Sequence, residues 1–437
     1  MKVHVEAYGC TLNKGEARMM AETLREGGHC IVDDVDLADA NLLVTCTVID
    51  ATERRMVSRM KSLAGTGKPL IVSGCMATAQ PATVTEIVPG AELVPPGDFV
   101  RLSEILGGRQ TEWREEITPI EPPDDSVEAI VPIAQGCIGR CAYCITKLAR
   151  GGLRSCQPEH VLWRVKRYLS AGYREIRLTA QDSTAYGRDI GLTLADLVES
   201  VADVAGDFRI RVGMASPQTC LPILDELVEA YSSPKVYKFL HLPVQSGDDE
   251  ILRAMGRGHS VDDFRRIVST FRDAYPDITL STDIIVGFPG ETEEQFKASM
   301  NLIEDVKPDT VNITRFSARP GTTAATMPCK LVGWRVKERS RLLTAQRFRI
   351  SRQINSEYEG RTLVAMTVEK GKSGTTLART LNYKQLVLRG DWPLGVTLAA
   401  KVVEGRNFDL LASVISERDP SSPEPISPPV DTTAASN

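Results

Sequence analysis

The 437-residue chain lacks an apolar run long enough to span a membrane, and it lacks an internal repeat. Residues 1–8 are typical of a short strand and have none of the marks of a signal peptide. These absences predict a cytoplasmic protein that has no membrane partner. Because thiols stay reduced in the cytosol, the ten cysteines indicate metal binding or catalysis and argue against a disulfide framework.

The most informative absence is that of a fourth cysteine beside Cys137, Cys141 and Cys144, which follow the spacing C-x3-C-x2-C. A structural zinc site takes four ligands, and a cubane iron–sulfur cluster normally takes four thiolates. Three thiolates would leave one iron of a cluster open, and an open iron can bind and reduce a ligand. Its natural ligand is S-adenosylmethionine, whose amino and carboxylate groups can chelate iron. The protein would then bind, orient and shield a radical-generating cofactor.

Residues 1–107 alternate between strand and helix patterns. Strands are expected at residues 3–7, 42–44 and 70–72, and helices at 16–25 and 50–63. This alternation predicts a small, doubly wound α/β domain with a mostly parallel sheet. The polar, proline-containing stretch that follows, residues 108–128, is typical of an interdomain linker.

Residues 129–330 repeat the alternation of strand and helix on a larger scale. Strands are expected at residues 130–134, 175–179, 209–214, 238–242, 279–286 and 310–315. Amphipathic helical stretches separate them, for example 159–171, 192–205 and 261–274. Six such units predict a partial (βα)6 barrel, which is smaller than the usual eight-unit barrel.

The C-terminal part of the chain has a different pattern. Residues 331–360 have the pattern of a long, arginine-rich connecting helix. Residues 361–416 contain five short strand patterns separated by turns, which predicts a small OB-like β-barrel. The tail, residues 417–437, is rich in proline and serine and poor in large apolar residues, which indicates disorder.

Polar and glycine residues recur just past the ends of the six central strands. In a (βα) barrel the active site lies at the carboxyl ends of the strands, so these segments are expected to converge on the open iron. The residues predicted to bind the cofactor are Gln181, Ser216, Gln245, Gly287, Gly290 and Glu291, together with the cysteine triad. Each segment taken alone also fits an ordinary turn, because glycine, proline and serine end strands in general.

A second set of cysteines follows the three expected strands of the N-terminal domain. Cys10, Cys46 and Cys75 would lie at the carboxyl edge of one parallel sheet, where ligands of such folds bind. They predict another three-thiolate cluster, although free cysteines also pack routinely as small apolar residues. The remaining cysteines lack such a context and are interpreted as packing residues: Cys30, Cys156, Cys220 and Cys329.

The net charge of −5 argues weakly against nucleic-acid binding, but the basic residues are unevenly distributed. Residues 335–352 contain seven basic residues and one acidic residue, and residues 361–416 contain eight basic and four acidic residues. This distribution predicts a phosphate-binding surface, although ordinary surface charge fits the same counts. The candidates for stacking on bases are Tyr383, Trp392 and Phe408.

Several motifs together resemble the methylthiotransferases. The Cys137 triad resembles the radical S-adenosylmethionine signature, and the three N-terminal cysteines and the segments 241–247, 282–292 and 319–322 are similar to that family. The resemblance covers nearly the whole chain and implies an N-terminal cluster domain and a C-terminal TRAM barrel. It further implies two [4Fe–4S] clusters and two uses of S-adenosylmethionine, one as radical source and one as methyl donor.

The segments 144–151 and 185–191 resemble the archaeal and eukaryotic branch of this family. That branch acts on N6-threonylcarbamoyladenosine next to the anticodon of tRNA, so the resemblance implies methylthiolation at C2 to give 2-methylthio-N6-threonylcarbamoyladenosine. It also implies an electron donor such as a ferredoxin or flavodoxin, and we expect a monomer. Three alternatives remain open: methylthiolation of a ribosomal-protein aspartate, a non-catalytic iron–sulfur protein that binds RNA or senses redox state, and another radical enzyme with a different accessory cluster.

Overall fold

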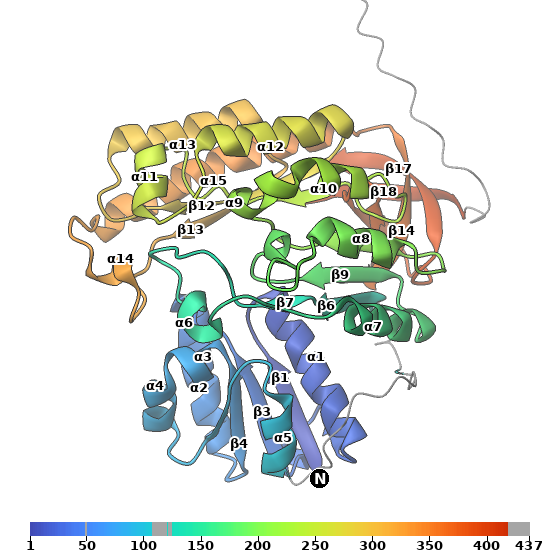
Figure 1. Cartoon of the computed structure of the whole chain (residues 1–437). Coiled ribbons are helices and arrows are strands. Elements are labelled where there is room, and N and C mark those ends of the chain that lie inside the picture. Colours follow the sequence, from blue (N-terminus) through green and yellow to red (C-terminus); the bar gives the residue numbers. More distant parts are fainter. Residues whose placement is uncertain (49, 107–119, 121–124, 418–437) are drawn as a thin grey trace, which may run out of the picture.

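The computed structural model describes residues 1–48, 50–106, 120 and 125–417 of the chain. Most of the predicted linker and nearly all of the predicted tail lie outside these described residues. Figure 1 shows the N-terminal domain at the bottom, the central domain above it and the C-terminal barrel at the upper right. Among the helices of the described residues, none combines the length and the apolar character that crossing a membrane requires.

The N-terminal domain is built on a five-stranded parallel sheet in the order β2-β1-β3-β4-β5. The strands are β1 (Lys2–Ala7), β2 (Cys30–Val32), β3 (Ala40–Thr45), β4 (Leu70–Gly74) and β5 (Glu92–Val94), and the helices are α1 (Thr11–Glu26), α2 (Asp50–Ala64), α3 (Cys75–Ala79), α4 (Pro81–Ile87) and α5 (Phe99–Leu106). Helices α1 and α5 pack on one face of the sheet, and α2, α3 and α4 pack on the other. The predicted doubly wound fold is confirmed, but the three-residue strands β2 and β5 were not predicted.

The central domain is a partial barrel of six parallel strands. They are β6 (Glu128–Pro132), β9 (Glu175–Thr179), β10 (Arg209–Val212), β11 (Phe239–His241), β12 (Thr279–Val286) and β13 (Thr310–Arg315). The first three pair with one another, the last three do the same, and a bridge between Ile210 and Val236 joins the two groups. The predicted partial (βα)6 barrel is therefore confirmed.

Helices connect and cover the strands of this barrel. They are α6 (Thr146–Arg150), α7 (Pro158–Ser170), α8 (Leu194–Ala202), α9 (Pro217–Cys220), α10 (Leu224–Ala230), α11 (Asp249–Ala254), α12 (Val261–Ala274), α13 (Glu293–Val306) and α14 (Thr323–Thr326), and a small hairpin is formed by β7 (Ala134–Gln135) and β8 (Arg154–Ser155). Capping boxes at Thr193, Ser260 and Thr292 fix where α8, α12 and α13 begin.

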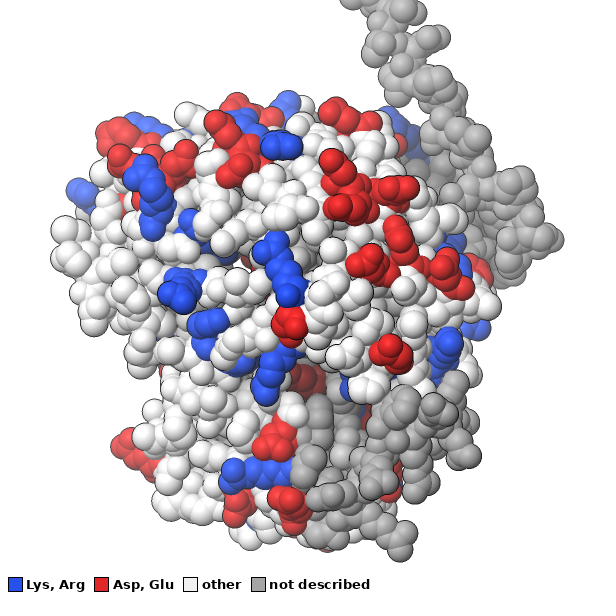
Figure 2. Space-filling view, in the orientation of Figure 1, with Lys and Arg blue, Asp and Glu red and all other residues white. Residues whose placement is uncertain are grey.

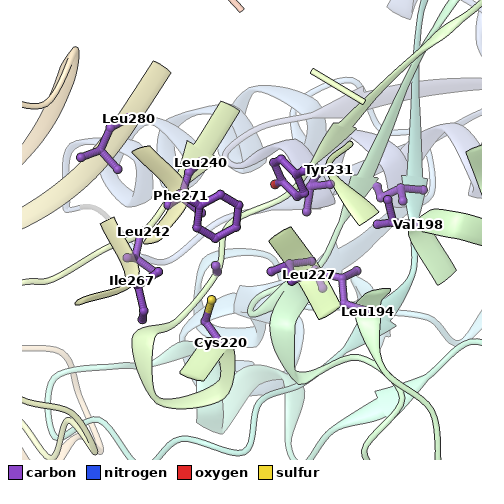
Figure 3. Close-up of a cluster of buried hydrophobic side chains, with 14 of the residues drawn as sticks. Leu194, Val198, Cys220, Leu227, Tyr231, Leu240, Leu242, Ile267, Phe271 and Leu280 are labelled. Atoms are coloured by element: carbon purple, nitrogen blue, oxygen red, sulfur yellow. The ribbon is translucent and has the colours of Figure 1, made fainter. Parts of the chain in front are cut away.

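The main core lies between the barrel strands and the helices outside them, as Figure 3 shows for one part. Six of the labelled side chains form pairs four residues apart, so both members lie on one face of a helix or its last turn: Leu194 and Val198, Leu227 and Tyr231, Ile267 and Phe271. They meet apolar side chains of β11 and β12, such as Leu240 and Leu280. Burial of each such side chain contributes about 1.5–3 kcal/mol, which keeps the strand ends in fixed positions.

A long helix, α15 (Gly333–Ser356), joins the central domain to a closed β-barrel. The barrel strands are β14 (Thr362–Lys370), β15 (Thr375–Thr380), β16 (Gln385–Arg389), β17 (Thr397–Gly405) and β18 (Leu410–Glu417). Pairing of β14 with β17 closes the ring in the order β14-β15-β16-β18-β17. The connecting helix and the five-stranded barrel agree with the sequence prediction.

The turn between β15 and β16 inserts into the floor of the central barrel. The backbone N of Lys238 donates to the carbonyl of Leu381 at 2.8 Å, just before β11. The ring of Tyr383 lies 4.4 Å from the ring of Phe239, measured between centroids. Tyr383 was a candidate for stacking on RNA bases, but its half-buried ring packs against aromatic rings of the central domain instead.

The other two stacking candidates differ in exposure. Trp392 is half-buried and donates from Nε1 to the carbonyl of Arg389 at 2.9 Å. Phe408 is 66% exposed and contacts the ring of Phe348 on α15, with 5.4 Å between centroids. Phe408 is thus the candidate whose ring faces outward.

Candidate active site

The three N-terminal cysteines lie at the carboxyl ends of three neighbouring strands. Cys10 is the N-cap residue of α1 after β1, Cys46 follows β3, and Cys75 is the first residue of α3 after β4. Gly9 has φ +104°, and a Cβ there would lie only 2.5 Å from Cβ of Cys46. A glycine is thus required where β1 ends, because its missing side chain lets the chain pass beside Cys46.

A buried arginine of the central domain reaches this triad. Arg150, at the end of α6, pairs with Glu16 and donates from Nη2 to Oδ1 of Asn13 at 2.8 Å. Burial raises the pKa of the Cys75 thiol to about 11, and the nearby Arg150 opposes this rise. Arg150 therefore links the two domains next to the cysteines.

The second triad lies in the loop between β7 and α6. The backbone N of Gly139 lies 3.3 Å from Sγ of Cys137, and Nη1 of Arg257 lies 3.5 Å from Sγ of Cys141. Burial raises the pKa of the Cys137 thiol to about 11. Donors placed beside sulfur stabilise thiolate, which is the form that binds iron.

Both triads line one cavity of about 470 Å³ between the N-terminal and central domains. Among the predicted cofactor-binding residues, Gln181, Ser216 and Gln245 also line this cavity. Gln181 accepts a hydrogen bond through Oε1 from the backbone N of Gly136 at 2.8 Å, which places its side chain beside the cysteine loop. Gln245 has φ +78°, so the chain turns sharply where it passes the cavity. The convergence expected from the strand ends is present for these residues.

The other three predicted residues, Gly287, Gly290 and Glu291, are not among those that line the cavity. Glu291 is buried, accepts from the backbone N of Gly287 at 2.8 Å, and pairs with Arg339 of α15 at 2.6 Å. A Cβ at Gly287 would lie 2.6 Å from a methyl carbon of Val336. The geometry therefore gives this loop the role of seating α15 against the central barrel.

Side chains of the barrel strands also line the cavity. Arg211 of β10 and Asp283 of β12 are charged residues that were not predicted from the sequence, and His241 of β11 lines the cavity as well. Nε2 of His241 and Nδ2 of Asn312 lie 3.0 and 2.7 Å from Oδ1 of Asp283. The sequence feature that could have identified Arg211 is the alternation Arg-Ile-Arg-Val in a central strand. Charged residues rarely face a barrel interior unless they have a partner or bind a ligand.

A further ion pair holds the two domains together at the rim. Arg319 is 4% exposed; its Nη1 lies 3.0 Å from Oε2 of Glu53 on α2, and its Nε donates to the carbonyl of Val48 at 3.2 Å. Arg319 begins the Arg-Pro-Gly turn after β13. This turn therefore fixes the N-terminal domain over the carboxyl end of the barrel.

The donor set fits two clusters better than single metal ions. Within the described ranges, no three His, Cys, Asp or Glu side chains converge tightly enough to hold one ion. Thiolates that bind different irons of a cluster are spread around it, so the wider arrangement of the six cysteines is consistent with iron–sulfur clusters. Each triad supplies three thiols to the cavity, which fits a cluster with one open iron.

The four cysteines interpreted as packing residues divide into two groups. Cys220 is fully buried in the core drawn in Figure 3, and Cys156 is half-buried against the same core. The prediction is wrong for Cys30 and Cys329, which are exposed. Cys30 begins the edge strand β2, and Cys329 lies in a turn with φ +59°, so neither faces a core.

The surface of the face drawn in Figure 2 is divided by charge. Lys and Arg side chains gather around its middle, between α9 and α6, whereas Asp and Glu side chains dominate the upper right over α8 and α10. The exposed face of α15 adds basic residues of its own at Lys337, Arg341 and Arg352. Not all of the predicted basic surface is available, because Arg339 is buried in its pair with Glu291.

Comparisons with known proteins assign this architecture to a family. Residues 131–303 match the Radical SAM superfamily, and residues 2–95 match the Uncharacterized protein family UPF0004. A radical S-adenosylmethionine methyltransferase, TsrM from Kitasatospora setae, solved with cobalamin and a [4Fe-4S] cluster, has a TM-score of 0.55 at 13% identity, covering 74% of this chain and 76% of that chain. At that identity the likeness concerns the fold alone.

Two relatives that match more than nine-tenths of this chain carry names that are more specific. A probable threonylcarbamoyladenosine tRNA methylthiotransferase of Pyrococcus abyssi is 43% identical over 429 residues, which cover 95% of this chain and 100% of that protein. The threonylcarbamoyladenosine tRNA methylthiotransferase of Xenopus laevis is 33% identical over 426 residues, covering 93% of this chain and 76% of that protein. The chain therefore belongs to the threonylcarbamoyladenosine tRNA methylthiotransferases, a branch of the radical S-adenosylmethionine methylthiotransferase family of enzymes.

Proposed function

We propose that this enzyme adds a methylthio group to C2 of N6-threonylcarbamoyladenosine next to the anticodon of tRNA. The product would be 2-methylthio-N6-threonylcarbamoyladenosine. The observation that carries this proposal is the single cavity lined by both cysteine triads, Cys137–Cys141–Cys144 and Cys10–Cys46–Cys75. A substrate base in this cavity would lie between a radical-generating centre and a sulfur-bearing centre.

Each triad has a distinct role in this proposal. Cys137, Cys141 and Cys144 would hold the [4Fe–4S] cluster that binds S-adenosylmethionine, and Cys10, Cys46 and Cys75 would hold the auxiliary [4Fe–4S] cluster. When bound, these groups supply a radical that removes hydrogen from C2, sulfur that attaches there, and a methyl group from a second S-adenosylmethionine. Gln181, Ser216 and Gln245 would bind S-adenosylmethionine from the cavity wall.

The protein's own residues position the reactants and exclude water. Arg150 and Arg319 hold the N-terminal domain against the barrel by two buried ion pairs, so the distance between the triads is fixed by the fold. Asp182, 5% exposed, accepts hydrogen bonds from Thr184 and Thr219 beside the cysteine loop and lines the cavity. Such buried, satisfied polar groups keep a radical site rigid and dry.

The basic face of α15 and the exposed ring of Phe408 support a tRNA partner. Phosphates would pair with the basic side chains, and a base in the anticodon loop would stack on the aromatic ring. An electron donor such as a ferredoxin or flavodoxin, and a monomeric state, stay predictions from the sequence.

The direct test is mass spectrometry of tRNA nucleosides from cells with and without the gene. The methylthiolated nucleoside should disappear on deletion, and its unmethylthiolated precursor should accumulate. Restoring the wild-type gene should bring the product back, whereas restoring a Cys137→Ala gene should not. This pair of results would show that formation of the product requires the proposed cluster site. An unchanged nucleoside profile on deletion would refute the proposed substrate.

The two-cluster arrangement has a separate test on reconstituted protein. Replacement of Cys10, Cys46 and Cys75 by alanine should remove about half of the bound iron, because one of two four-iron clusters loses its ligands. Cys30→Ala is the matched control, since Cys30 is an exposed cysteine of the same domain away from the cavity. Retention of all iron by the triple variant would remove the auxiliary cluster from this account.

A further inference from the structure

Among the described residues, one cationic side chain of the cavity has neither a hydrogen-bond nor an ion-pair partner. Among the described residues, the Lys and Arg side chains that line the cavity are Lys147, Arg150, Arg211 and Arg257. Lys147 donates to the carbonyl of Cys137, and Arg150 is paired with Glu16. Arg257 donates to the carbonyl of Pro243 at 3.0 Å and lies beside Cys141. Arg211 forms no hydrogen bond or ion pair with any residue that the structure describes.

The guanidinium of Arg211 is nevertheless held in place by aromatic rings. Its central carbon lies 4.9 Å from the ring centroid of Phe239 on the neighbouring strand and 5.8 Å from that of Tyr383. Tyr383 comes from the C-terminal barrel and adopts φ +65°, a conformation that turns it into the central domain. Two rings therefore fix the position of Arg211 while leaving its N–H donors unused.

Asp283, an acidic residue that lines the same cavity, is already engaged. Oδ1 of Asp283 is approached by His241 at 3.0 Å and by Asn312 at 2.7 Å. An arginine that lines a cavity and has all its N–H donors free of protein partners is suited to a carboxylate of a ligand, which it can bind through two parallel hydrogen bonds. The position of Arg211 in the cavity wall is therefore suited to an anionic group of a bound ligand.

We propose that Arg211 is the specificity-determining residue that binds the threonyl carboxylate of the substrate nucleoside. This inference rests on the proposed function, because the threonylcarbamoyl group is the part of that nucleoside that bears a carboxylate. The contact holds the modified adenine in the cavity without touching the reacting carbon. It makes Phe239 and Tyr383 positioning residues, which act through Arg211.

The test compares two anticodon stem-loop RNAs that differ only in the charge of the threonyl group on the modified adenosine. One carries N6-threonylcarbamoyladenosine, and the other carries its neutral threonine carboxamide analogue. Reconstituted wild-type enzyme should bind the carboxylate RNA roughly 10- to 100-fold more tightly, the range expected for hydrogen bonds between charged partners. Arg211→Gln should bind both RNAs with equal affinity, and Arg211→Lys should keep part of the preference.

Arg209→Gln is the matched control, because Arg209 lies two residues away on the same strand and pairs with Asp207 outside the cavity. It should keep the full preference for the carboxylate RNA. S-adenosylmethionine also bears a carboxylate, so its reductive cleavage is measured in parallel. A loss of cleavage by Arg211→Gln with the RNA preference intact would reassign Arg211 to the cofactor and overturn the proposal.

The other outcomes also have defined meanings. Equal affinity of the wild-type enzyme for both RNAs would overturn the proposal without any variant, even if Arg211→Gln did not fold. Preference retained in Arg211→Gln would overturn it as well. A failure of the proposed function would look different from a failure of this inference. In that case the wild-type enzyme would bind the carboxylate RNA more tightly but would form no methylthiolated product from it.

Discussion

Arg379 of the C-terminal barrel points its guanidinium at the buried carboxylate of Glu175 at the start of β9, with Nε 3.2 Å from Oε2. Arg177 and the hydroxyl of Tyr237 contact the same carboxylate at 2.7 and 3.1 Å. Burial acts to raise the pKa of Glu175, but Arg379 and Arg177 outweigh it and hold the pKa below its usual value. The barrel is thus joined to the floor of the catalytic domain through a buried charge.

Replacement of Arg379 should destabilise this junction strongly. In Arg379→Gln the fully buried Glu175 loses one of its two guanidinium partners. Because breaking a buried ion pair costs about 3–5 kcal/mol, the free energy of unfolding should fall by about that amount. Urea unfolding followed by circular dichroism would measure the loss. Arg389→Gln, an exposed arginine of the same barrel, should change stability by less than about 0.5 kcal/mol. Equal effects of the two substitutions would contradict the role of the buried pair.

Substitution of Gly9 should impair the N-terminal cluster specifically. A Cβ in Gly9→Ala would lie 2.5 Å from Cβ and 2.9 Å from Sγ of Cys46, so the cysteine must move. We expect reconstituted Gly9→Ala to lose up to half of its iron. Gly28→Ala is a close control, because Gly28 also has positive φ, at +88°, but faces open space. If both variants bind the same amount of iron as the wild-type protein, the close contact between Gly9 and Cys46 is not needed for the cluster.

Acid should destabilise the protein partly through His259. This side chain is 8% exposed, and burial, with help from Arg257, lowers its pKa to about 4. The unfolded chain takes up a proton near pH 6.5, whereas the folded chain keeps His259 neutral until about pH 4. Stability is therefore lost as pH falls through this window, by about 2 kcal/mol between pH 7 and pH 5.

The contribution of His259 is measured as a difference between variants. His259→Asn lacks the titrating group, so its free energy of unfolding should fall less than that of wild type over the same pH range. His160→Asn, at an exposed position, should follow the wild-type curve. A His259→Asn curve parallel to wild type would show that this histidine does not titrate as its burial indicates.

The basic face of α15 should make tRNA binding dependent on salt. Lys337, Arg341 and Arg352 are exposed and lie on one side of the helix, since their spacings are close to whole turns. Their joint replacement by alanine should weaken tRNA binding and reduce the slope of log affinity against log salt by about 2–3. The matched triple variant at Arg25, Arg55 and Lys61, exposed residues of the N-terminal domain, should leave the slope unchanged. A slope unaffected by both triple variants would place the phosphate contacts elsewhere.

The order of elements was readable in the sequence because it depends on local periodicity. Short strand patterns that alternate with amphipathic helical stretches marked the central domain, and helical patterns marked α12 and α15. The two triads were also readable, because each cysteine directly follows a strand and parallel strands end at the same edge. The three-residue strands β2 and β5 were missed, whereas β11, which also has three residues, was found within the expected strand 238–242.

Local sequence also misassigned several side chains. Glu291 was expected in the cavity but pairs with Arg339, and Tyr383 was expected on RNA but packs on Phe239. In both cases the partner lies on an element far away in the chain. Nothing near either residue in the sequence identifies that partner.

By itself, the sequence determined the fold class, the positions of six cysteines at strand ends and the family to which the chain belongs. Only the tertiary structure decided that both triads face one cavity, which depends on domain contacts such as Arg150 with Glu16. It also decided which charged residues pair with other residues of the protein. Among the described residues, Arg211 lines the cavity without a hydrogen-bond or ion-pair partner. The physical reason is that a strand's period fixes which residues end it, whereas the pairing of a buried charge depends on whichever distant element packs against it.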